Sequence, residues 1–319
     1  METELRPRPP TSRSHDSPFC HVRRLPDPSL DEDWQRIIVP DHIKTRLLRH
    51  IKVLSLLAQC GASDIGLALR RAVLLYGPPG TGKTSLGRGL ANEWAKASGQ
   101  SALLVVANAH AVPSGERGGS QKNVQTLFRD LSEIASTGQP VVVLFDEVES
   151  MGTNRANLNS DTNPADTSLS VNSFIESLDE LVRKHHNVVL IFTTNIPRDI
   201  DPAITERVDF SMLVPLPDAQ TRRSIICNAT LELDRLCGSD VANSLRSALA
   251  SERANDLLEL THGQSPRQSR HLIVSALTYA PSLQELEFNH LIQAAQAQKE
   301  EEIHNRQTGG VYTHAYQQT

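Results

Sequence analysis

The stretch "LLYGPPGTGKTS", residues 74–85, passes from an apolar run into glycine and proline and ends on lysine, threonine and serine. The apolar residues Ala72–Tyr76 predict a strand, and a helix is expected to begin at Ser85 or slightly earlier and to reach Trp94. The spacing G-x-x-x-x-G-K-T between a strand and a helix is typical of a loop whose backbone N–H groups surround phosphate. The alternative, a plain glycine-rich turn, is disfavoured by this order of elements.

Two side chains of this loop have distinct expected roles. Lys83 is long enough to reach the β- and γ-phosphates of a nucleotide, and the Thr84 hydroxyl is placed to bind Mg²⁺. We therefore expect a nucleoside triphosphate and Mg²⁺ as cofactors. The predicted phosphate-binding residues are Gly77, Pro78, Pro79, Gly80, Thr81, Gly82, Lys83, Thr84 and Ser85.

Composition excludes several classes of protein. The chain has 319 residues and a formal net charge of −5, which suits one large domain or two modest ones. No apolar run approaches the roughly 18 residues of a membrane span, and the first residues lack the apolar core of a secretory signal. The four cysteines are too far apart for a redox or zinc pair, so we expect idle thiols in a reducing cytoplasm. The mild acidity argues against a nucleic-acid partner.

The N-terminal segment differs in composition from the rest. Six of the 18 prolines fall within the first 30 residues, among scattered arginines and serines, which predicts a disordered leader over residues 1–32. From Asp33 a short extended piece is followed by a predicted helix of about 17 residues from Asp41.

Strands and helices then alternate. Continuous β-branched runs at 102–108, 141–147 and 188–195 are typical of parallel strands that are buried on both faces. Helical segments lie between them, so residues 33–216 are predicted to form an α/β domain with a doubly wound parallel sheet. Only helical segments follow, which predicts a small all-α lid domain over residues 217–306 and a flexible tail over 307–319.

Two carboxylates end the strand in "VVVLFDEVESM". Asp146 and Glu147 should lie at the carboxyl edge of the sheet, where the phosphate loop also lies. Asp146 would hold a Mg²⁺-bound water, and Glu147 would deprotonate the attacking water as a general base. The alternative is a charged strand end that meets solvent, and the phosphate loop upstream favours the catalytic interpretation.

Two further polar side chains are candidates for contact with the same nucleotide. The strand 188–195 ends on Asn195. If this strand lies between the strand before the phosphate loop and the strand before Asp146, the Asn195 amide reaches the γ-phosphate and positions the water. Arg267, in "HGQSPRQSRHL", begins a helix of the predicted lid. It either reaches back to the phosphates or forms a structural salt bridge.

Arg207, in "DPAITERVDF", is expected to face away from the nucleotide of its own chain. It would then stabilise the developing charge on a nucleotide that a neighbouring subunit binds, an effect of about 10³ to 10⁵ in rate in comparable enzymes. The alternative is a surface arginine that pairs with Glu206 or Asp209.

The motifs "GPPGTGKT", "LFDEVES", "TTN" and "ERVD", in this order and ahead of a helical lid, resemble a P-loop ATPase module of the AAA+ type. The stretches "DEVESM", "PADTSLSVNSFIESLDEL", "NVVLIFTTNIPRDID" and "ERVDF" resemble more narrowly the pachytene-checkpoint or thyroid-receptor-interactor branch. Members of this branch are hexameric remodellers of HORMA-domain proteins. The resemblance extends from about Asp33 to Ile292.

The resemblance assigns a role to each candidate residue. It implies a homo-hexamer that uses ATP and Mg²⁺ to remodel a HORMA-domain partner, with a role in bacterial antiphage signalling. Ile37 and Ile38 lie where the family packs adenine. The matched positions are Lys83 and Thr84 for Walker A, Asp146 and Glu147 for Walker B, Asn195 for sensor 1, Arg207 for the arginine finger and Arg267 for sensor 2.

Two departures from the family are visible. About 30 proline-rich residues stand where eukaryotic members carry a folded N-terminal domain, so we expect a minimal bacterial member. The loop that would line the central pore, residues 108–121, has no aromatic residue. Its apolar candidates for gripping a substrate chain are Ala111, Val112 and Pro113, and the alternative is a flexible surface loop.

Two other functions remain open from sequence. A loader or helicase helper that acts on DNA-linked complexes would need a basic groove and stacking aromatics, whereas aromatics make up only 4% of this chain. A nucleotide-gated scaffold without turnover usually lacks a catalytic residue, and here Lys83, Asp146, Glu147 and Arg207 are all present.

Overall fold

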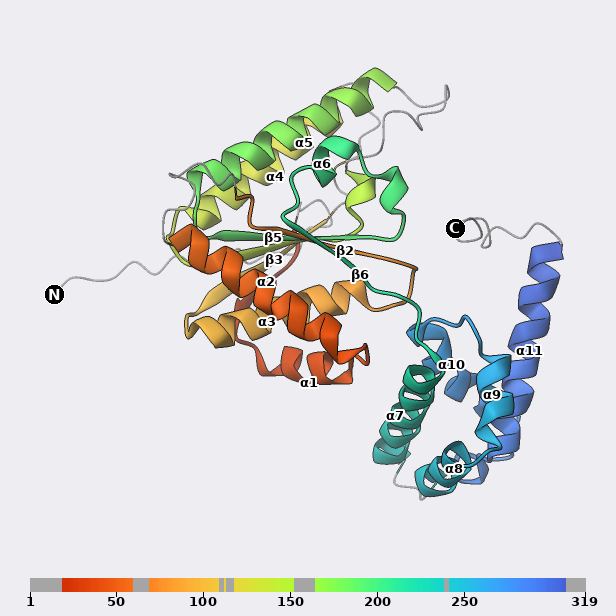
Figure 1. Cartoon of the computed structure of the whole chain (residues 1–319). Coiled ribbons are helices and arrows are strands. Elements are labelled where there is room, and N and C mark those ends of the chain that lie inside the picture. The colour runs from red at the N-terminus through yellow and green to blue at the C-terminus, as the bar shows by residue number, and fades with distance from the viewer. Residues whose placement is uncertain are drawn as a thin grey trace.

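The computed structural model describes residues 19–59, 69–108, 112, 118–151, 164–237 and 241–307. An α/β unit with a central sheet is followed in the chain by a bundle of helices, and the two lie side by side (Figure 1). No helix among the described residues is long and apolar enough to cross a membrane.

The sheet has six strands in the order β1-β3-β4-β5-β2-β6. All neighbouring strands are parallel except β1, which pairs antiparallel with β3. β5 lies between β4 and β2, as the expected role of Asn195 requires. The strands are β1 (Phe19–Leu25), β2 (Ala72–Tyr76), β3 (Ala102–Ala107), β4 (Val141–Phe145), β5 (Val188–Thr194) and β6 (Phe210–Leu213).

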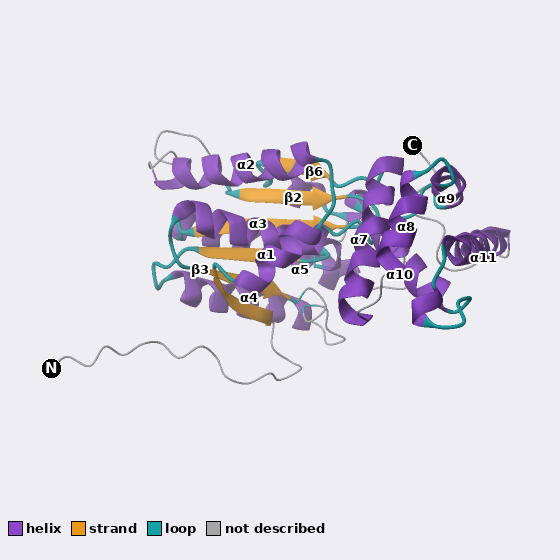
Figure 2. Cartoon of the chain, turned by 90° about the horizontal axis from the view of Figure 1, so that it is seen from below, coloured by secondary structure: helices purple, strands orange, loops and turns teal. Residues whose placement is uncertain are grey.

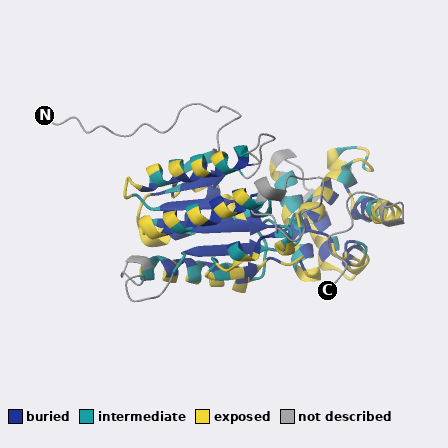
Figure 3. Ribbon diagram, turned by 90° about the horizontal axis from the view of Figure 1, so that it is seen from above, coloured by how far each residue is buried: buried dark blue, intermediate teal, exposed yellow. Residues whose placement is uncertain are grey.

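Helices cover both faces of the sheet, which buries every residue of β4 and β5 (Figure 3). This explains why those strands read as unbroken apolar runs. One face carries α1 (Pro28–Arg36), α2 (Asp41–Gln59) and α3 (Lys83–Ser98), and the other carries α4 (Gly119–Ala135) and α5 (Pro164–Lys184). The predicted doubly wound α/β class is confirmed.

The helical unit has a core of its own, in which Ile226, Leu245, Leu257, Leu272 and Leu291 are fully buried. The helices of this unit are α7 (Ala219–Cys237), α8 (Val241–Ala250), α9 (Ala254–Leu260), α10 (Pro266–Leu277) and α11 (Phe288–Gln307). The carboxyl end of β2 points toward α7 and α10 (Figure 2). The predicted all-α lid is therefore observed, whereas its exact boundary at residue 217 stays a prediction.

The predicted disordered leader over residues 1–32 is wrong for its second half. Residues 19–25 form β1, and α1 begins at Pro28, where a missing N–H costs no helical hydrogen bond. Leu25 and Leu30 are each only 2% exposed. The side chain of Asn92 on α3 accepts from the N–H of Asp27 at 2.7 Å and donates to its carbonyl at 3.1 Å, which fixes the turn between the two elements. Residues 1–18 and 308–319 lie outside the described residues.

α1 packs against α3 with little space between them. A Cβ at Gly89 would lie 2.5 Å from Cε3 of Trp34, closer than any ordinary contact. The absence of a side chain at this position is what lets the Trp34 ring lie on α3.

We expect Gly89→Ala to lower the free energy of unfolding by about 1–3 kcal/mol, because the added methyl overpacks this contact. Chemical denaturation would measure the change. In a Trp34→Ala background the same substitution should no longer destabilise the protein, since the ring that it strikes is gone. An equal loss in both backgrounds would contradict this account of the packing.

Candidate active site

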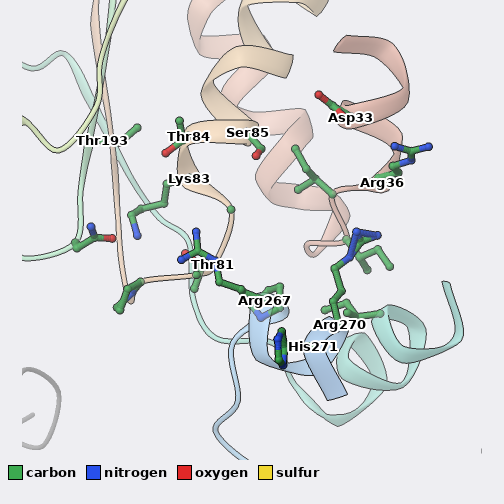
Figure 4. A pocket seen from close by; sticks show the side chains of 18 of the residues that line it. Asp33, Arg36, Thr81, Lys83, Thr84, Ser85, Thr193, Arg267, Arg270 and His271 are labelled. Atoms are coloured by element: carbon green, nitrogen blue, oxygen red, sulfur yellow. The ribbon is translucent and has the colours of Figure 1, made fainter. Parts of the chain in front are cut away.

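A cleft of about 670 Å³ lies between the carboxyl edge of the sheet and the lid (Figure 4). Residues from six parts of the chain meet there: the end of α1, the phosphate loop, the ends of β4 and β5, and helices α7 and α10. They are Asp33, Arg36, Ile37, Ile38, Pro79, Gly80, Thr81, Gly82, Lys83, Thr84, Ser85, Asp146, Glu147, Thr193, Asn195, Ile225, Pro266, Arg267, Arg270, His271 and Val274.

Lys83 is held within the loop that precedes it. Its Nζ donates to the carbonyls of Gly77 and Pro78, at 2.8 Å each, and the residue is 5% exposed. Burial lowers the pKa of Lys83 to about 8, although the nearby carboxylates of Glu149 and Asp146 partly oppose the shift. The loop therefore holds a cation that is almost fully shielded from solvent, and a phosphate group would form a favourable ion pair with it. Gly77 and Pro78 do not line the cleft themselves and contribute these carbonyls.

The two carboxylates after β4 are fixed by hydroxyls and an amide. Asp146 Oδ1 accepts from Thr84 Oγ1 at 2.7 Å and from Thr193 Oγ1 at 2.5 Å. Glu147 has a left-handed backbone (φ 53°), and its N–H donates to Thr193 Oγ1 at 3.1 Å. Asn195 Nδ2 donates to Glu147 Oε1 at 3.2 Å. The sheet thus brings the expected base and the expected water-positioning amide into direct contact.

The donor set around Thr84 fits Mg²⁺. A hydroxyl and a carboxylate oxygen 2.7 Å apart are the hard oxygen ligands that this ion prefers. No group of three or more His, Cys, Asp or Glu residues in the described ranges could hold a metal ion by itself. Mg²⁺ commonly binds through one or two protein oxygens together with phosphates and waters, so these two residues would hold it together with a nucleotide.

The lid touches the phosphate loop at the start of α10. Arg267 N–H donates to the Gly80 carbonyl at 3.3 Å. Gly80 has φ +77°, and a Cβ there would lie 2.8 Å from Ser265 Oγ, so only glycine fits this approach. Arg267 lines the cleft beside Thr81 (Figure 4). Its alternative role as a salt-bridge residue finds no support, because no ion pair of Arg267 occurs in the described part of the chain.

Ile37 and Ile38 line the cleft as well, and Ile225 and Val274 of the lid add further apolar side chains to its lining. Such side chains suit a flat, apolar base. Sequence reasoning did not identify the lining residues Asp33, Arg36, Thr193, Ile225, Pro266, Arg270, His271 and Val274. The spacing of Arg270 and His271 from Arg267, three and four residues along one helix, could have placed them on the same face.

Arg207 does not line the cleft. It follows α6 (Pro202–Thr205), which lies on the side of the sheet that α5 covers (Figure 1). The alternative prediction, that Arg207 forms an ion pair with Glu206 or Asp209, is wrong. Arg207 instead binds Asp179 of α5, with Nη2 at 2.8 Å from Oδ2.

The expected gripping role of Val112 is contradicted. Val112 is 2% exposed and belongs to the core that α4 and α5 form with the sheet, and its carbonyl accepts from Asn123 Nδ2 at 3.2 Å. The side chain of Val112 packs into this core and is therefore not available to contact a substrate chain. Ala111 and Pro113 lie outside the described residues.

Comparison with known proteins agrees with this geometry. Residues 73–216 match the sequence pattern of the ATPase family associated with various cellular activities (AAA). CD-NTase-associated protein 6 of Pseudomonas aeruginosa is 35% identical over 64% of this chain and 67% of its own length. The pachytene checkpoint protein 2 homolog of Danio rerio is 33% identical over 66% of this chain. The match spans 50% of that protein, so the chain covers about half of its eukaryotic relative.

Solved structures share the fold. PCH-2 of C. elegans superposes with a TM-score of 0.73 at 23% identity, over 89% of this chain and 75% of that one. A chain of the E. coli MS115-1 HORMA:CdnC:Trip13 complex gives a TM-score of 0.68 at 20% identity, over 87% of this chain and 94% of that one.

We expect the affinity for ADP, measured without divalent cations, to fall as the pH rises from about 7 to about 9. Lys83 has its pKa lowered to about 8 by burial, so it is cationic below this pH and loses its proton above it. Isothermal titration calorimetry in two buffers of different ionisation enthalpy should show proton uptake on binding near pH 8. Lys83→Arg, which keeps its charge throughout, should bind without this uptake. Uptake of the same size in both proteins would exclude Lys83 as its source.

Proposed function

The chain belongs to the AAA ATPase family, among relatives of CD-NTase-associated protein 6 and pachytene checkpoint protein 2, and we propose that it is a ring-forming enzyme that hydrolyses ATP to remodel a HORMA-type protein. The observation that carries the proposal is the meeting of Lys83, Asp146, Glu147 and Asn195 in one cleft.

The cleft supports hydrolysis through its own side chains. Lys83 and the backbone of the phosphate loop bind the β- and γ-phosphates, while the lid adds the charge of Arg267. Thr84 and Asp146 would hold Mg²⁺, which neutralises phosphate charge when bound. Glu147 takes the proton of the attacking water, and Asn195 keeps that carboxylate oriented through the 3.2 Å hydrogen bond.

The position of Arg207 supports a ring. This arginine lies outside the cleft of its own chain, where it would be placed to meet a γ-phosphate on a neighbouring subunit. We propose six subunits per ring, as the resemblance to the pachytene-checkpoint branch implies. Each active site would then be completed by the next subunit, and an isolated chain would turn over ATP slowly.

The proposed substrate is a HORMA-domain protein. A chain of this fold occurs in a complex named for HORMA and CdnC, and a relative of this chain is named for its association with a CD-NTase. By likeness to them, cycles of hydrolysis would pull on one element of a closed HORMA domain and release the peptide that it holds. The consequence would be to switch off a signalling complex in antiphage defence.

We expect the protein with ATP and Mg²⁺ to release a fluorescent peptide from a closed HORMA–peptide complex. Glu147→Gln should still bind ATP but should release no peptide, because the phosphate loop survives while the water loses its base. Fluorescence anisotropy would follow release, and phosphate production would follow turnover. Release by Glu147→Gln at the rate of the unmodified protein would refute coupling to hydrolysis, and DNA-stimulated turnover without release would favour a DNA-linked function.

A further inference from the structure

Asp179 holds Arg207 by a side-on, two-point contact. The carboxylate lies on α5, and Arg207 Nε is 3.0 Å from each of its oxygens, while Nη2 is 2.8 Å from Oδ2. Arg207 Nη1 donates to the Ala203 carbonyl at 2.7 Å. The guanidinium is therefore fixed on two sides, by a neighbouring helix and by the turn before it.

These contacts do not use every N–H group of the guanidinium. A guanidinium has five N–H groups, and these hydrogen bonds use one each on Nε, Nη1 and Nη2. Within the described part of the chain, the two remaining N–H groups, one on each Nη, have no hydrogen-bond partner. Each of these N–H groups could donate to a phosphate oxygen. The side chain of Arg207 is 21% exposed, so it is not closed off from solvent.

The charge of Arg207 is not cancelled by its partner. Arg70 Nη1 lies 2.8 Å from Asp179 Oδ1, so two guanidinium groups share one carboxylate. Arg70, Arg207 and Asp179 together carry a net positive charge, which favours an anion that approaches from outside, although the Glu206 carboxylate also attracts Arg207.

We propose that Asp179 is a positioning residue for ATP hydrolysis, which holds the guanidinium of Arg207 in place for the γ-phosphate bound by the neighbouring subunit. The inference rests on the proposed function, in which Arg207 acts in trans. Arginine is a long side chain with many rotamers, and Asp179 fixes it in one of them before the subunits meet. The rate then gains from an arginine that is already oriented.

The first test compares Asp179→Asn with Glu206→Gln, a matched acid-to-amide control on the residue beside Arg207. Asp179→Asn should lower kcat by about 10- to 100-fold, the loss expected from misplacing a catalytic group by about 1 Å. KM for ATP should stay within about twofold, because Asp179 does not line the cleft. Asp179→Glu should recover part of the rate. Glu206→Gln should keep the full rate, and an Asp179→Asn rate equal to this control would overturn the proposal.

The second test separates this inference from the proposed function by mixing inactive subunits. Lys83→Ala protomers keep an intact Asp179–Arg207 pair, so they should restore activity to Asp179→Asn protomers in mixed rings, as they should to Arg207→Ala protomers. No recovery with Arg207→Ala, in rings shown by native mass spectrometry to be mixed, would refute the trans role itself. Recovery with Arg207→Ala but not with Asp179→Asn would overturn the positioning role alone.

A third set of measurements controls for loss of rate through misfolding. If Asp179→Asn fails to fold, as judged by its melting temperature, the same comparisons are made with Asp179→Ala. In an Arg207→Ala background, substitution of Asp179 should cause no further loss of kcat, because the side chain that it positions is absent. A further loss of the same size would show that Asp179 acts through the fold and would overturn the proposal.

Discussion

One carboxylate oxygen joins the parts of the active site. Asp146 Oδ1, at the end of β4, accepts hydrogen bonds from Thr84 at the start of α3 and from Thr193 near the end of β5. β5 lies between β4 and β2, so Thr193 is next to the end of β4 and close to the phosphate loop that follows β2. The candidate nucleotide cleft therefore depends on the strand order, and the lid lies beside this edge of the sheet.

The same sheet separates two functional surfaces. Lys83 and Glu147 face the cleft beside the lid, whereas Arg207 lies with Asp179 outside it. In the proposed mechanism, assembly therefore completes each active site, and Arg207 would make one subunit responsive to the nucleotide of the next.

The sequence was most informative where local pattern and burial agree. The phosphate loop has a continuous motif and the four central strands are continuous apolar runs. The sequence therefore predicts that Asn195, at the end of one of these strands, lies near the phosphate loop. β1 could not, because Arg23 and Arg24 interrupt an edge strand that is stabilised by pairing with β3. Val112 was misjudged because composition does not say which way a loop residue turns. The partner of Arg207 lies 28 residues away on α5, and no local spacing points to it.

The most direct test of the account is a cryo-electron microscopy structure of Glu147→Gln with ATP and Mg²⁺. We predict a closed ring in which each nucleotide lies between the phosphate loop and Arg267, with the guanidinium of Arg207 from the neighbouring subunit on its γ-phosphate. Density for ATP in this cleft, with Arg207 of every neighbour far from the phosphates, would contradict the proposed division of the active site between subunits. Nucleotide bound elsewhere would contradict the site itself.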